Sequence, residues 1–109
     1  MPNGKKAVVS DEKLLRYLLY PLHPVGGPHT TLFDRLLGIN STCADLLRHA
    51  LLQAASDTEA TAGKPSDFGQ KFEIRCPLAG PRGSYTVLSV WMIKVGTDVP
   101  ELVTAYITK

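Results

Sequence analysis

The spacing of apolar residues is helical in the first half of the chain and alternating in the second half. Before residue 56, apolar residues recur three and four positions apart, which places them on one face of a helix. The pattern predicts three helices, over residues 10–20, 30–37 and 40–54. Ser10 is a typical N-cap, Pro21 ends the first helix, and Gly38 fits the C′ position of the second.

After Gly69 the period of the pattern changes to two. Alternation of apolar and charged residues is typical of a half-buried strand. Here Phe72, Ile74, Cys76 and Leu78 alternate with Lys71, Glu73 and Arg75. Residues 84–95 are apolar on both faces and predict a central strand, and residues 102–108 predict a last strand. Because the connections between these strands are short, we predict an antiparallel meander.

The order of the elements, helices first and strands afterwards, predicts an α+β fold in a single domain covering residues 1–109. Three N-terminal helices would pack on a C-terminal antiparallel sheet of three to four strands. The helical half spans residues 10–56, a loop spans 57–69, and the sheet half spans 70–108. The second half is too short to fold alone, so the loop joins two halves of one domain rather than two domains. Residues 7–9 form either a short strand or an anchoring arm.

Composition and charge narrow the classes of protein only slightly. With 44% hydrophobic and 20% charged residues, the chain is able to form a core. A net charge of +2 does not by itself indicate nucleic acid. Cys43 and Cys76 lack metal-ligand spacing and form either a disulfide or two buried free thiols, the second being typical of a reducing compartment. No apolar stretch resembles a leader or a membrane span, so we expect a cytoplasmic protein.

An irregular segment between the first two predicted helices, residues 21–29, carries two histidines. Its three prolines and two glycines forbid regular structure. Histidine has the side-chain pKa closest to neutrality, so His23 and His29 are candidates for acid–base chemistry. A histidine in such a loop often only donates a hydrogen bond to a nearby carbonyl, and that alternative stays open.

A second group of candidates lies on the predicted strands. Alternation places Thr104 and Tyr106 on one side of the last strand, opposite its apolar residues. If the register permits, these hydroxyls would share one sheet surface with other polar and aromatic side chains. The expected companions are Lys71, Arg75, Ser89 and Trp91.

This combination suits cleavage of RNA. A general base removes the ribose 2′-hydroxyl proton, a general acid protonates the leaving 5′-oxygen, and cations or hydroxyls stabilise the charged phosphorane. An aromatic ring stacks an unpaired base. No metal or other cofactor is expected, in keeping with the lack of a carboxylate cluster. Each residue also has an ordinary alternative role: Trp91 in core packing, Thr104 and Tyr106 as strand formers, Lys71 and Arg75 in protecting a sheet edge.

Two stretches of the chain resemble a small uncharacterised bacterial domain family. The first contains His23-Pro24-Val25-Gly26 followed by Leu37-Gly38. The second contains Gly80-Pro81-Arg82-Gly83, Trp91 and Gly96-Thr97-Asp98-Val99-Pro100-Glu101-Leu102. Members of this family occur as stand-alone proteins and as C-terminal toxin modules of contact-dependent exoproteins. Their layout is similar to the barnase/EndoU/colicin/RelE-like ribonucleases.

The resemblance implies a metal-independent ribonuclease toxin, with RNA as substrate and a cognate antitoxin or immunity protein as partner. His23 matches the family histidine, and Trp91, Thr104 and Tyr106 match family strand positions. The family's lysine-alanine pair falls at His29-Thr30 here. A protonated His29 would have to replace that lysine. This departure leaves a second hypothesis open, a non-enzymatic protein-interaction module related to the toxin domain.

Overall fold

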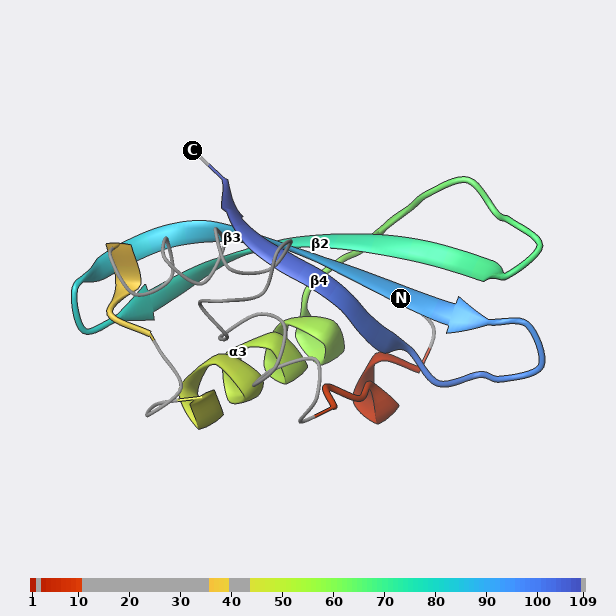
Figure 1. Cartoon of the computed structure of the whole chain (residues 1–109), viewed down its shortest axis with the longest axis horizontal. Helices are drawn as coiled ribbons and strands as arrows, with labels where there is room; N and C mark the ends of the chain where they lie inside the picture. Colours follow the sequence, from red (N-terminus) through yellow and green to blue (C-terminus); the bar gives the residue numbers. More distant parts are fainter. Residues whose placement is uncertain (2, 11–35, 40–43, 109) are drawn as a thin grey trace, which may run out of the picture.

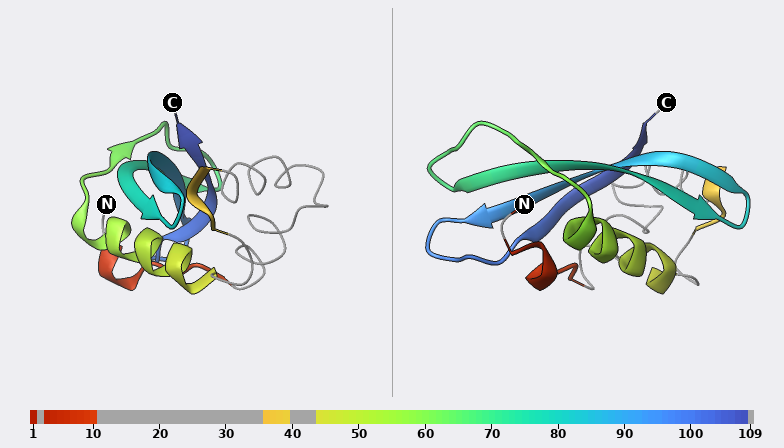
Figure 2. Two further views of the ribbon diagram at one scale, coloured as in Figure 1. Left: turned by 90° about the vertical axis from the view of Figure 1, so that its left-hand side faces the viewer. Right: turned by 180° about the vertical axis from the view of Figure 1, so that it is seen from behind.

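The computed structural model describes residues 1, 3–10, 36–39 and 44–108 (Figure 1). A twisted, four-stranded antiparallel sheet packs one face against a helix, so the α+β class is confirmed. The elements are η1 (Gly4–Lys6), α3 (Ala44–Asp57), β1 (Thr61–Ala62), β2 (Gly69–Gly80), β3 (Gly83–Lys94) and β4 (Glu101–Thr108). Both views of Figure 2 show α3 and η1 on the same side of the sheet.

The predicted helices are only partly covered by the described residues. The third predicted helix corresponds to α3, which is described from Ala44 and ends at Asp57 rather than at residue 54. Its extra turn continues the helical hydrogen bonding, because the Thr58 N–H donates to the Ala54 carbonyl at 2.9 Å. The first two predicted helices lie almost entirely outside the described residues. One α-helix, not three, is therefore described.

The sheet is a meander, with strands in the spatial order β1-β2-β3-β4, as predicted. A two-residue turn joins β2 to β3, and β3 is central between β2 and β4. The register pairs Phe72 with Trp91 and Val87 with Ile107. The short strand β1 falls inside the predicted loop, where two residues are too few to show a period.

The core lies between α3 and one face of the sheet, which we call the inner face. The helix contributes Leu47, Leu51, Ala54 and Ala55. The sheet contributes Ile74, Cys76, Leu78, Val87, Trp91, Leu102, Ala105 and Ile107. Burial of these apolar side chains is the main source of stability for the domain.

A second contact connects the helical half to the turn between β2 and β3. The Arg82 N–H donates to the Leu37 carbonyl at 3.1 Å. A Cβ at Gly80 would overlap that same carbonyl, so only glycine permits this close approach. Gly38 has a φ of 75°, the left-handed conformation expected at a C′ position. Two motifs far apart in the sequence therefore meet at this end of the sheet.

The N-terminal segment attaches to the other end of the sheet. The Val8 N–H donates to the Pro100 carbonyl at 2.9 Å, and the Leu102 N–H donates to the Val8 carbonyl at 3.1 Å. These bonds form a single parallel bridge to β4, so residues 7–9 act as an anchoring arm rather than a full strand. Within the described ranges, no helix is long and apolar enough to cross a bilayer.

Candidate functional site

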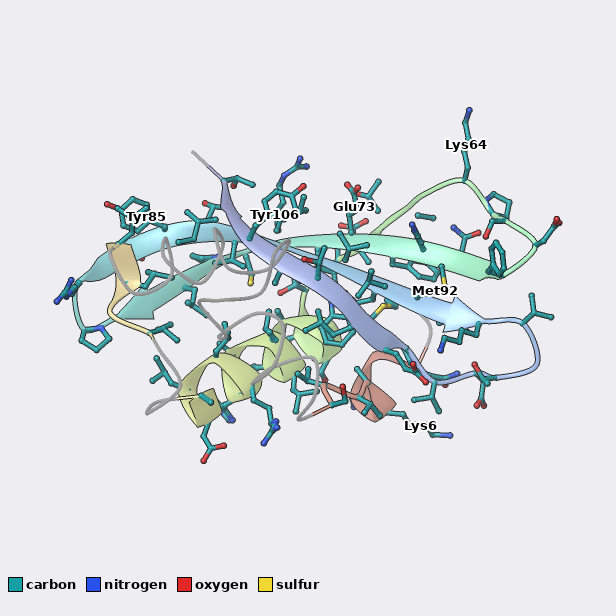
Figure 3. The ribbon with its side chains drawn as sticks, in the orientation of Figure 1. Lys6, Lys64, Glu73, Tyr85, Met92 and Tyr106 are labelled. Atoms are coloured by element: carbon teal, nitrogen blue, oxygen red, sulfur yellow. The ribbon has the colours of Figure 1, made fainter. Side chains whose placement is uncertain are left out.

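The face of the sheet opposite α3, which we call the outer face, carries most of the predicted site residues. The register places Arg75, Leu88 and Tyr106 in one cross-strand row. Since neighbouring strands lie about 4.8 Å apart, Arg75 and Tyr106 are separated by about 10 Å at the backbone. Figure 3 shows Glu73 and Tyr106 projecting on the side away from α3.

Lys71 and Thr104 also lie on the outer face. Lys71 is two residues from Glu73 on β2, and Thr104 lies in the row of Glu73 and Val90. The structure thus brings Lys71, Arg75, Thr104 and Tyr106 onto one surface. The cations come from β2 and the hydroxyls from β4, with the apolar side chains of β3 between them.

Trp91 does not belong to this surface, and the prediction that it does is wrong. It is paired with Phe72, so its side chain lies on the inner face, and it is 0% exposed. Its Nε1–H donates to the Ser89 Oγ at 2.9 Å, and that hydroxyl donates to the Ile74 carbonyl at 3.3 Å. Ser89 is buried with it. The ring is a core residue with no face open to an RNA base.

The four outer-face candidates differ in how far they reach solvent. Lys71 and Arg75 are exposed, whereas Tyr106 and Thr104 are half-buried. The Thr104 Oγ1 atom is itself enclosed and has no hydrogen-bond partner among the described residues. A hydroxyl carries one donor and two acceptor lone pairs, so this atom retains unused hydrogen-bonding capacity. Arg75 and Lys71 are therefore the side chains most open to a phosphate.

The two candidate catalytic histidines, His23 and His29, lie outside the described residues. A third histidine, His49, is exposed on α3, on the other side of the sheet from the outer-face candidates. Its distance from that face makes it a natural control for any experiment on His23.

A groove at one end of the outer face was missed by the sequence analysis. It has a volume of about 510 Å³. Its lining residues are Lys64, Ser66, Phe68, Lys71, Met92 and Lys94, and we call it the lysine groove. Only Lys71 among them is a predicted site residue. The one signal in the sequence is an aromatic residue, Phe68, in a loop made otherwise of small and polar residues.

The loop of residues 63–68, between β1 and β2, forms one wall of the lysine groove and is held against the sheet by hydrogen bonds. Ser66 and Gly69 exchange two of them, at 2.9 and 3.2 Å. The Val95 N–H donates to the Phe68 carbonyl at 3.0 Å. The Gln70 side chain donates to the Gly63 carbonyl. The loop therefore has a defined position although its side chains are exposed.

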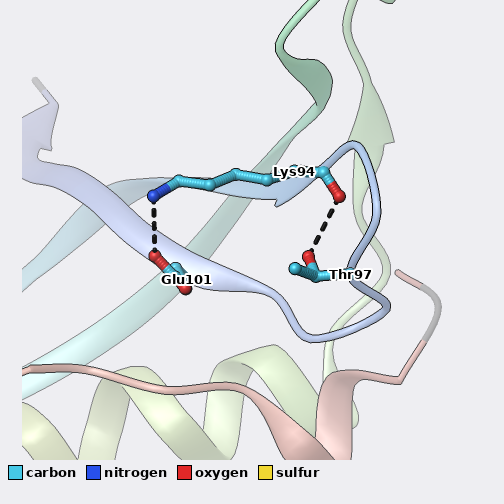
Figure 4. Close-up of polar contacts among 3 residues, drawn as sticks. All are labelled: Lys94, Thr97 and Glu101. Carbon is cyan, nitrogen blue, oxygen red and sulfur yellow. Dashed lines mark hydrogen bonds and ion pairs between the residues drawn. The ribbon is translucent and has the colours of Figure 1, made fainter.

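One lysine of the groove has an acidic neighbour. The Lys94 Nζ lies 3.4 Å from the Glu101 Oε2, and the Thr97 hydroxyl donates to the Lys94 carbonyl (Figure 4). The side chains of this ion pair are 59% and 50% exposed. Exposed pairs are screened by water and salt, so this one holds Lys94 only weakly.

A smaller groove of about 270 Å³ lies between α3 and β2, and Cys76 is among its lining residues. Cys76 is a free thiol, and burial raises its pKa above the ordinary value. A thiol in this state is a poor nucleophile at neutral pH. Cys43 lies outside the described residues. Across the described ranges, no group of three His, Cys, Asp or Glu side chains is placed to hold a metal ion.

The match to a known family extends over the whole chain. Residues 1–109 match a family model described as a domain of unknown function, DUF6883. The chain belongs to this family. No curated protein and no solved structure matches it. Because the description of DUF6883 states no activity, the relation of this domain to toxin modules stays a prediction.

Proposed function

We propose that this DUF6883 domain is a metal-independent ribonuclease of the toxin type that binds RNA on its outer face. The observation that supports this function is the shared surface of Lys71, Arg75, Thr104 and Tyr106. The two exposed cations and the half-buried Tyr106 suit a phosphodiester, whose charge increases in the transition state, whereas the Thr104 Oγ1 is enclosed. The inner face offers no such set, since its side chains form the core.

In the proposed reaction, one of His23 and His29 takes the proton of a ribose 2′-hydroxyl. The 2′-oxygen then attacks the adjacent phosphorus, and the bond to the 5′-oxygen breaks. The second histidine donates a proton to that leaving oxygen. The products are a 2′,3′-cyclic phosphate and a free 5′-hydroxyl. Arg75 and the Tyr106 hydroxyl would stabilise the charged phosphorane, and Lys71 would bind a neighbouring phosphate. A bell-shaped dependence of rate on pH follows from one acid and one base.

A second candidate function is a protein-interaction module without enzymatic activity. The observation that favours it is a pair of exposed apolar side chains, Phe68 and Val95, joined by a backbone hydrogen bond of 3.0 Å. The substitution of the family lysine-alanine pair by His29-Thr30 points the same way. In the toxin hypothesis, a cognate antitoxin or immunity protein would instead cover the outer face.

Cleavage of RNA by the purified protein separates the two functions. The wild type, His23→Ala and His49→Ala would each be incubated with an oligoribonucleotide in the presence of EDTA. We expect cyclic-phosphate ends from the wild type and from His49→Ala, and intact RNA from His23→Ala. Intact RNA in all three reactions, with circular dichroism showing folded proteins, would reject the ribonuclease and favour the interaction module.

A further inference from the structure

We propose that the lysine groove is a subsite for single-stranded RNA, with Phe68 stacking an unpaired base and the lysines binding the flanking phosphates. This inference rests on the proposed ribonuclease function and names the form of RNA that the outer face takes. It also transfers the base-stacking role expected for Trp91 to a residue that is exposed. Phe68 is 78% exposed, whereas Trp91 is 0% exposed.

Phe68 is presented to solvent by a loop of defined conformation. Its carbonyl accepts from the Val95 N–H at 3.0 Å, and its own N–H donates to the Ser66 Oγ at 3.3 Å. Both bonds fix the backbone and leave the ring free. A large aromatic ring held in this way loses little conformational entropy when a base stacks on it. Met92 lies in the same groove and adds a polarisable apolar surface.

The lysines of the groove come from three different segments. Lys71 is opposite Met92 in the β2–β3 register, and Lys94 is two residues further along β3. Lys71 and Lys94 are thus diagonal neighbours on one face, with their Cα atoms about 7–8 Å apart. Lys64 rises from the loop on the side of the sheet where Glu73 lies (Figure 3). Three lysines therefore line the groove together with one aromatic ring, an arrangement that suits the alternating phosphates and bases of a nucleic acid strand.

Acidic side chains also border the groove and affect its charge. Glu101 pairs with Lys94 at 3.4 Å, Glu73 follows Lys71 on the outer face, and Asp67 precedes Phe68 in the loop. Because the Lys94–Glu101 pair is exposed, a phosphate is able to displace the carboxylate at small cost. Removing the Glu101 charge therefore strengthens binding of an anion, and removing the Lys94 charge weakens it.

The geometry favours single strands over duplexes. A base must be unstacked and unpaired before its face is able to contact Phe68. In an RNA duplex the base faces are buried in the stack, and only the phosphates remain for the lysines. Binding that depends on Phe68 is accordingly binding to a single strand.

The test is fluorescence anisotropy with a labelled 2′-O-methyl oligoribonucleotide. This strand has the phosphates and bases of RNA but no free 2′-hydroxyl to act as the nucleophile, so it binds without being cleaved. We expect Phe68→Ala and Phe68→Leu each to weaken binding about tenfold, and Phe68→Trp to retain it. Val95→Ala, a neighbouring exposed apolar position, is the matched control and should leave binding unchanged. Similar affinities for wild type and Phe68→Ala would overturn the subsite.

Charge variants test the lysines independently. Lys94→Gln should weaken binding severalfold and Glu101→Gln should strengthen it, while Lys6→Gln on η1 should have no effect. With three lysines engaged, the logarithm of affinity should fall against the logarithm of salt concentration with a slope of about two. A duplex bound as tightly as the single strand, or no effect of either charge variant at the groove, would contradict the inference.

The two proposals fail in different ways. Cleavage of natural RNA that is unaffected by Phe68→Ala would reject the subsite and leave the ribonuclease intact. Binding of the 2′-O-methyl strand that depends on Phe68, without cleavage of natural RNA, would reject the ribonuclease and leave the subsite intact. Absence of binding to any strand would overturn the subsite regardless of cleavage.

Discussion

The inner and outer faces of the sheet are built from the same three long strands and have opposite chemistry. On the inner face, Trp91 and its neighbours are packed against α3, and the polar atoms among them are hydrogen-bonded to one another. On the outer face, the cations of β2 and the hydroxyls of β4 flank an apolar strip on β3. A step of one residue along a strand therefore separates a stability role from a binding role.

The largest expected effect comes from the inner face at Trp91. Trp91→Ala should lower the free energy of unfolding by about 3–5 kcal/mol, since it leaves a cavity in the core. Met92→Ala, one residue along and on the outer face, should cost much less because Met92 is only half-buried. Urea unfolding followed by circular dichroism measures both. Equal losses would mean that the two faces do not differ in packing.

Loss of the Ser89 hydroxyl should have a smaller effect. Ser89→Ala removes the acceptor of the Trp91 Nε1–H and leaves a buried donor unpaired, which costs about 1–3 kcal/mol. Ser84→Ala, an exposed position on the same strand, should stay within about 0.5 kcal/mol of the wild type. Urea unfolding measures both variants. Equal stability of the two would contradict a stabilising hydrogen bond between Trp91 and Ser89.

The pH dependence of stability sharpens the contrast at Cys76. Burial raises the pKa of this thiol in the folded state, so its contribution to stability is complete below the ordinary thiol pKa. That contribution is lost as the pH rises through the higher pKa of the folded state. Between neutral and alkaline pH, the wild type should therefore lose more stability than Cys76→Ala. Equal losses, measured by urea unfolding at each pH, would contradict a raised pKa of the Cys76 thiol in the folded state.

The smallest effect belongs to the ion pair on the outer face. A double-mutant cycle with Lys94→Gln and Glu101→Gln should give a coupling free energy of about 0–1 kcal/mol, decreasing with salt. The pair would then influence RNA binding far more than folding. A coupling well above this range would show that the pair is structural and that Lys94 is not available to a phosphate.

Much of the sheet was predictable because its strands alternate regularly. The β2 pattern placed Lys71 and Arg75 opposite the apolar residues, and the structure agrees. Trp91 was misplaced because both faces of β3 are apolar, so alternation within that strand does not identify the core side. Only the cross-strand pairing with Phe72 does so, and register is a tertiary property.

The lysine groove was beyond prediction for a different reason. Its wall is a loop whose position depends on a hydrogen bond between Phe68 and Val95, which are far apart in sequence. No periodicity carries that information. The end of α3 at Asp57 and the two-residue strand β1 were missed for a similar reason, since short segments are set by their contacts rather than by a pattern.

The most direct test of the account is cleavage of an oligoribonucleotide by Arg75→Gln, with Arg82→Gln as a matched control. Arg75 lies on the outer face in the row of Tyr106, while Arg82 is exposed in the turn between β2 and β3. If the outer face is the ribonuclease site, Arg75→Gln should lose about a hundredfold in rate and Arg82→Gln should retain wild-type activity. Equal rates in the two variants, or no cleavage by the folded wild type, would contradict it.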